Sequence, residues 1–158
     1  MAQYGSSPDA HPAPTDAPAS VLTAVKLIWA SVALSLINAV VGFVLIDDIV
    51  DSVTEGTSTD TDAARTGAIV GLVIGLVIGV AIAALFAYFI RKGANWARIV
   101  YTVLSALFLL LGLFGIASQP PLLLVLTLIG YALTIAILYF LYRPDSNAYF
   151  KKDTRFAA

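Results

Sequence analysis

The 158-residue sequence contains no cysteine and only one histidine, His11. Without cysteine the chain has no disulfide, no thiolate nucleophile and no zinc site of the cysteine type, and one histidine cannot form a metal-binding cluster. Charged residues make up only 12% of the chain and its net charge is -1, so it offers no basic stripe to replace the counterions on nucleic-acid phosphates. We therefore expect no metal, no cofactor and no nucleic-acid partner.

Charge and proline are also scarce in four long apolar stretches of the chain. Lys26 is the only charged residue within them, and all seven prolines lie in the terminal segments or at the Pro120-Pro121 turn. Ion- and proton-coupled carriers usually place a charged side chain inside the membrane, and transporter sites are often marked by interrupted helices. Catalysis needs an acid, a base or a metal ligand. These absences disfavour coupled transport and predict that the protein is not an enzyme.

Apolar residues account for 59% of the chain and concentrate in those four stretches. Each stretch is close to the roughly 20 residues with which a helix crosses the hydrocarbon core of a bilayer. Continuous runs of this length are helical, because a barrel strand needs only about 9–11 alternating residues. The sequence predicts an all-α fold, an integral membrane four-helix bundle of antiparallel hairpins running up-down-up-down. The predicted helices cover residues 21–46, 66–90, 99–117 and 122–142.

Three further segments complete the predicted organisation. Residues 1–20 form a Pro- and Ala-rich tail that we predict to be disordered, residues 47–65 an acidic loop, and residues 144–158 a basic and aromatic tail. We interpret the acidic loop as a solvated connection in preference to a weak divalent-cation site, because it lacks the spacing and the glycine of an EF-hand.

The basic residues near the helix ends predict an orientation in the membrane. Arg91, Lys92 and Arg98 surround the second connection and Arg143 follows the fourth helix, whereas the first connection carries six carboxylates against Arg65. Lys and Arg are preferentially retained in the cytoplasm. The predicted location is therefore the cell membrane, with both termini cytoplasmic and the acidic loop outside.

Aromatic and basic residues gather where the predicted helices reach the cytoplasmic boundary. Aromatic rings favour the headgroup zone and basic side chains contact anionic headgroups, so membrane lipids are expected partners. The pattern recurs at both hairpins, which indicates either a duplicated hairpin or the aromatic belt and cation bias alone. The predicted interfacial anchors are Trp29, Arg91, Lys92, Trp96, Arg98, Arg143, Tyr149, Phe150, Lys151 and Lys152.

The second predicted helix carries a row of small residues spaced four apart. In lipid, a smooth groove of this kind lets another helix approach closely, which gains dispersion contacts and weak hydrogen bonds. We predict that this face makes the closest helix contact in the protein. A helix of the same chain is the first candidate to cover the row, and a homo-oligomer or a membrane-protein partner is the second. The row consists of Gly67, Gly71, Gly75, Gly79 and Ala83.

Polar side chains share one face of the first predicted helix and one face of the fourth. An unpaired amide is costly in hydrocarbon, so Asn38 is predicted to face the bundle and bond to Tyr131 or to a backbone carbonyl. An internal hydrogen bond that fixes helix register and a polar substrate site are the two interpretations of these groups. The intramembrane polar set is Ser31, Ser35, Asn38, Thr127, Tyr131 and Thr134.

Two short motifs flank the second hairpin. The third predicted helix opens with GANWAR at residues 93–98, and the fourth is followed by RPDSNAYF at residues 143–150. In these motifs the chain resembles uncharacterised small four-helix membrane proteins of actinobacteria. The resemblance implies a cell-membrane location and the four-helix fold, and no activity. Small multidrug exporters share the helix count, but their first helix holds a carboxylate, whereas the deep polar group here is Asn38.

Two functions remain after these exclusions. The leading interpretation is a non-enzymatic membrane protein that packs with itself or with partner membrane proteins as an assembly or accessory subunit. It is motivated by the glycine row and by the basic, aromatic C-terminal segment. The alternative is a small permease or lipid-handling protein that uses the face of Ser31, Ser35, Asn38 and Tyr131.

Overall fold

In the computed structural model, the described residues are 16–58, 60–116 and 119–151. These residues form six helices and no strand, which confirms the all-α fold class. The four long helices are α1 (Ala19–Val44), α3 (Thr61–Arg91), α4 (Asn95–Gly115) and α5 (Pro121–Leu141). The two short helices are α2 (Ile46–Thr54) and α6 (Pro144–Phe150).

Local sequence explains where the long helices begin. Helix α5 starts at Pro121, because a proline at the first helical position loses no intrahelical hydrogen bond. At the start of α3, the Asp60 carboxylate accepts hydrogen bonds from the backbone N–H groups of Asp62 (2.9 Å) and Ala63 (3.2 Å). This N-cap satisfies two of the free donors of the first turn, so α3 begins at Thr61, earlier than predicted.

The acidic segment is not a single loop. Its first part is helix α2, which packs against α3 and in which Ile46 and Val50 are buried. Asp47 lies in the first turn of α2, where a carboxylate favours the positive end of the helix dipole. It also forms an ion pair with Arg65 of α3, at 2.9 Å between Nε and Oδ1. The predicted acidic loop is therefore corrected to α2, a short turn and the first residues of α3.

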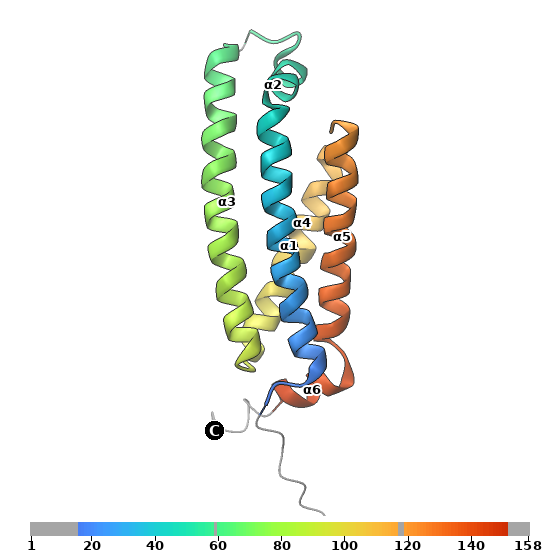
Figure 1. Ribbon diagram of the computed structural model, residues 1–158. Coiled ribbons are helices and arrows are strands. Elements are labelled where there is room, and N and C mark those ends of the chain that lie inside the picture. The colour runs from blue at the N-terminus through green and yellow to red at the C-terminus, as the bar shows by residue number, and fades with distance from the viewer. Residues whose placement is uncertain (1–15, 59, 117–118, 152–158) are drawn as a thin grey trace, which may run out of the picture.

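Successive long helices run in opposite directions, and α6 lies at the end where α1 begins and α3 and α5 finish (Figure 1). We call this end the α6 end and the opposite one the α2 end. Helix α1 packs most extensively against α5 and next against α3, so it is the centre of the bundle. Helix α4 makes much less extensive contacts with α3 and α5. The arrangement is therefore open on the side where α4 diverges from α3.

The buried core lies toward the α6 end, and much of the remaining helix surface is apolar. Side chains of α1, α3, α5 and α6 meet in this core. Toward the α2 end, Val44 is 73% and Phe114 is 87% exposed. Lipid solvates such side chains better than water does. By length and composition, α1, α3, α4 and α5 are long and apolar enough to cross a membrane. The largest fully buried apolar side chains are Val21, Ile28, Ile90, Ile137, Leu141 and Phe150.

Candidate functional site

The glycine row of α3 does not pack against another helix of the described chain. A Cβ built at Gly67, Gly71, Gly75 or Gly79 would meet no neighbouring atom within 4 Å, and all four glycines are exposed. The first interpretation, in which a helix of the same chain covers the row, is therefore wrong for the described chain. The physical reason is the course of α4, which diverges from α3 after their connecting turn (Figure 1) and makes only limited contact with it.

Two glycines outside the row carry close interhelical contacts instead. On α1, Gly42 is buried, and a Cβ there would lie 3.4 Å from Cδ1 of Leu72 on α3. On α4, a Cβ at Gly112 would overlap the hydroxyl oxygen of Tyr131 on α5. Gly112 thus lets the Tyr131 side chain reach the α4 backbone. Sequence reasoning missed it because a single glycine within an apolar helix has no repeat spacing to mark it.

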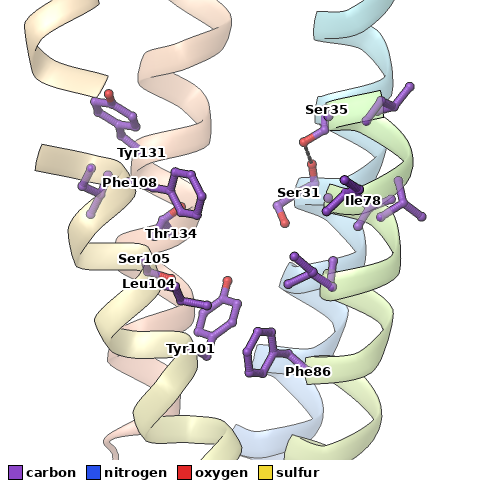
Figure 2. A pocket seen from close by; sticks show the side chains of 18 residues that line it. Ser31, Ser35, Ile78, Phe86, Tyr101, Leu104, Ser105, Phe108, Tyr131 and Thr134 are labelled. Atoms are coloured by element: carbon purple, nitrogen blue, oxygen red, sulfur yellow. Dashed lines mark hydrogen bonds between the residues drawn. The ribbon is translucent and has the colours of Figure 1, made fainter. Parts of the chain in front are cut away.

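Part of the glycine row lines a groove between α3 and α4, with α1 and α5 behind it (Figure 2). The groove has a volume of about 640 Å³. Its lining is mostly apolar, includes no charged residue and combines small residues with hydroxyl groups. The lining that matters here comprises Ser31 and Ser35 of α1, Gly75, Gly79 and Ala83 of α3, Tyr101 and Ser105 of α4, and Tyr131 and Thr134 of α5.

The serine and threonine hydroxyls of α1 and α5 in the groove already donate to their own helices. Ser31 Oγ donates to the Ile28 carbonyl (2.7 Å), and Ser35 Oγ donates to the Ser31 carbonyl (2.9 Å; Figure 2). Thr134 Oγ1 donates to the Gly130 carbonyl (2.9 Å). Each hydroxyl therefore retains only acceptor capacity. The groove is suited to an uncharged, largely apolar occupant such as a helix or an acyl chain.

The predicted pairing of Asn38 with Tyr131 is wrong. Helices α1 and α5 touch, but the Tyr131 hydroxyl lies against Gly112 of α4. The half-buried Asn38 does not line the groove, and its amide has no hydrogen-bond partner among the described residues. Thr127 also does not line the groove, and its hydroxyl donates to Oε1 of Gln119 (2.8 Å). The predicted polar set thus divides into four residues that reach the groove and two that do not.

The two sequence motifs meet at the α6 end through Arg98. Its Nη1 donates to Oδ1 of Asn147 (2.7 Å) and to the Leu141 carbonyl (3.4 Å). Its guanidinium carbon lies 4.7 Å from the ring centroid of Tyr142 and 4.8 Å from that of Phe150. Asn147 Nδ2 donates to the Tyr142 carbonyl (3.0 Å), which holds the amide oxygen toward Arg98. Arg98 therefore links α4 to α6, and its predicted interfacial position stays a prediction.

Helix α6 is fastened to the bundle by a buried serine pair. Ser146 is fully buried and donates to the Phe140 carbonyl (2.7 Å), so Ser20 of α1 is the donor in their 2.8 Å hydrogen bond. Phe150 is 1% exposed and belongs to the core. Two predictions are corrected here, since Ser20 belongs to α1 and not to a disordered tail, and Phe150 is a core residue and not an interfacial anchor. Residues 1–15 and 152–158 lie outside the described residues.

The second fastening joins the end of α6 to the α3–α4 turn. The Tyr149 hydroxyl donates to the Arg91 carbonyl (3.0 Å). The Tyr149 ring lies over Gly93, where a Cβ would be 3.0 Å from Cε1 of the ring. Gly93 also has a φ of 86°, a conformation that side-chain-bearing residues rarely adopt. Glycine is thus required here twice, for the turn and for the ring, and Tyr149 is a docking residue in addition to its predicted interfacial position.

Most of the other predicted anchors are exposed near the α6 end. Trp29 and Trp96 are each 50% exposed. The Lys92 ammonium lies 4.5 Å from the centroid of the Tyr88 ring. Lys152 lies outside the described residues. The exposed predicted anchors are Trp29, Arg91, Lys92, Trp96, Arg143 and Lys151.

The part of the chain that the structure describes contains no group of three or more His, Cys, Asp or Glu side chains placed to hold a metal ion. His11 lies outside it. At the α2 end, Asp47 is engaged by Arg65, and Asp60 caps α3. These two carboxylates therefore have structural partners.

Comparison with known proteins gave no match. No protein-family model matches the chain, and neither a curated protein nor a solved structure matches it. A function must therefore be inferred from the groove, the glycine row and the α6 end.

Proposed function

We propose that the protein is a non-enzymatic integral membrane protein that packs with a second copy or with a partner membrane protein, as an assembly or accessory subunit. Its four long helices span the cell membrane in this proposal, with both termini cytoplasmic and the α2 end outside. The observation that carries it is the uncovered glycine row, where a built Cβ would meet nothing within 4 Å.

Four glycines without a close neighbour are costly for an isolated helix. Each costs about 1 kcal/mol relative to alanine, so the row costs α3 about 4 kcal/mol unless another contact offsets it. A helix packed into the row supplies that contact, because the two backbones approach closely. Ile74 and Ile78 stand beside the row, each 52% exposed. As β-branched side chains they lose little rotamer freedom when a helix packs against them.

A second copy of the chain is the occupant that we favour. Its α3 carries the same row, so two copies related by a twofold axis would face each other glycine to glycine. The groove has no charged lining residue and offers hydroxyl oxygens as acceptors. It therefore suits a transmembrane helix better than a charged solute.

Cysteine cross-linking in the native membrane tests this packing, because the chain has no cysteine of its own. Oxidation should produce a disulfide-linked dimer from the Gly75→Cys chain. The matched Ala81→Cys chain, exposed on a different face of α3, should give none. Absence of a cross-link at Gly75, and equally at Gly71, would contradict self-association. Mass measurement in mild detergent would then separate a different protein partner from a monomer.

A second candidate function follows from the groove itself. Its volume of about 640 Å³ falls within the roughly 300–1,000 Å³ of small-molecule pockets, and it brings together Ser31, Ser35 and Tyr131. These features support a small permease or lipid-handling protein. A monomer that retains a bound lipid or solute through purification would favour this function, whereas a defined oligomer with an empty groove would favour assembly.

The orientation is tested with the same cysteine-free background. A cysteine at Thr57 should react with a membrane-impermeant reagent on whole cells, and one at Lys92 should react only after lysis. The reverse pattern would overturn the orientation without affecting the proposed packing.

A further inference from the structure

Charge is distributed very unevenly along the bundle. Of the seven basic residues that the structure describes, only Arg65 lies at the α2 end, and it is paired with Asp47. The other six lie at or near the α6 end, together with two carboxylates, Asp16 and Asp145. The six remaining described carboxylates lie at the α2 end. The net charge of -1 therefore conceals a positive end and a negative end.

Four of these cations lie at the two ends of α6 and at the α3–α4 turn against which α6 docks. The Tyr149 hydroxyl donates to the Arg91 carbonyl, so the last turn of α6 lies against the α3–α4 turn. Lys151 follows that turn and is brought to the side of the bundle where α3 ends, while Arg143 stands at the other end of α6. We call Arg91, Lys92, Arg143 and Lys151 the basic shelf, and all four residues are exposed. The last turn of α6 and the α3–α4 turn are adjacent only through this tertiary contact, which joins residues 58 positions apart in sequence.

The basic shelf lies beside a collar of exposed aromatic rings. Tyr88 is 55%, Trp96 50% and Tyr139 65% exposed. Lys92 Nζ lies 4.5 Å from the Tyr88 ring centroid, and Arg143 Cζ lies 5.9 Å from that of Phe140. Exposed apolar helix surface continues directly from this collar toward the α2 end. Cations between aromatic rings and apolar helix surface stand at headgroup level in a bilayer.

We propose that the basic shelf is a binding surface for the headgroups of anionic phospholipids, which settle against α6 and the α3–α4 turn. This inference rests on the proposed membrane insertion of the four helices and is independent of the proposed packing through α3. A lipid phosphate is the favoured source of negative charge over a soluble phosphate, because the aromatic collar and the apolar helices hold the shelf where lipids are present.

The test titrates the purified full chain in neutral detergent with phosphatidylglycerol or with phosphatidylcholine, and follows bound lipid by native mass spectrometry. Phosphatidylglycerol should bind more tightly. In the Arg91→Gln/Lys92→Gln chain its Kd should rise about thirtyfold, the fold-change that about 1 kcal/mol per basic residue gives for two residues. The matched Arg65→Gln chain, altered at the α2 end, should bind phosphatidylglycerol as the parent does.

Three results would overturn the inference. They are equal affinity for the two lipids, an unchanged Kd in the double variant, and displacement of phosphatidylglycerol by inorganic phosphate at equal concentration. The Arg91→Lys/Lys92→Arg chain keeps both charges and should keep the lipid preference, which separates loss of charge from loss of fold. If the lipid preference is absent while the Gly75→Cys cross-link forms, this inference alone fails. If the cross-link is absent while the lipid preference is present, only the proposed packing fails.

Discussion

Replacing Arg98 by Met should release α6 from the bundle while keeping an apolar stem of similar length. The hydrogen bond to Asn147, at 2.7 Å, is charge-assisted and worth about 1.5–3 kcal/mol. The contact with the Phe150 ring of α6 adds about 0.5–2 kcal/mol, whereas the Tyr142 ring belongs to the end of α5 and does not hold α6. The buried Arg98 Nε has no partner among the described residues, which offsets part of this gain. We therefore expect α6 docking to weaken by about 3 kcal/mol.

A cysteine at Ser146 reports this release directly. Ser146 is 0% exposed, so a thiol there reacts only when α6 leaves the bundle. A loss of about 3 kcal/mol should raise the rate of modification by a thiol reagent about 10²-fold. The matched Arg91→Met chain loses an exposed cation. Because Arg91 contacts α6 through its backbone carbonyl, which the substitution keeps, the rate of thiol modification should not change. Equal rates in the Arg98→Met and Arg91→Met chains would refute the reasoning.

Three further substitutions test single contacts by thermal unfolding in mild detergent. Gly112→Ala should lower the free energy of unfolding by about 1–3 kcal/mol, because the new Cβ overlaps the Tyr131 hydroxyl. Adding Tyr131→Phe should recover part of this loss, and no recovery would disprove the contact. Gly93→Ala should cost about 1–2 kcal/mol, because of its φ of 86° and its proximity to Tyr149, and a neutral effect would argue against both. Asp60→Ala should cost about 1 kcal/mol by removing the N-cap of α3, and an unchanged unfolding temperature would count against that cap.

The helical fold was predictable from sequence because an apolar run of about 20 residues specifies a spanning helix by its length. The short helices were not predicted, although α6 carries the signals of a helix start. Pro144 stands at its first position and Asp145 in its first turn. Ser146 and Phe150, four residues apart, share the buried face. The basic and aromatic composition of this segment obscured that periodicity.

Helix rotation and neighbour choice could not be predicted in the same way. The cost of an unpaired amide predicts that Asn38 has a partner, but each residue turns a helix by about 100°, so this cost does not define which neighbouring helix the side chain faces. The Tyr131 side chain is directed to Gly112 on α4 instead. The spacing of the glycine row likewise identifies a smooth face without identifying what covers it. The rotation of each helix and its choice of neighbour depend on tertiary contacts, such as that of Arg98 with Asn147, which no sequence pattern marks.

The most direct test of the proposed assembly is the mass of the Gly75→Ile chain in mild detergent, measured by size-exclusion chromatography with light scattering. A Cβ at Gly75 meets nothing within 4 Å and Gly75 lines the open groove, so the substitution should leave the fold of one chain intact. The matched Ala81→Ile chain adds the same bulk to an exposed position on another face of α3. The account predicts an oligomer for the parent and for Ala81→Ile, and a folded monomer for Gly75→Ile. A Gly75→Ile chain with the mass of the parent oligomer would contradict it.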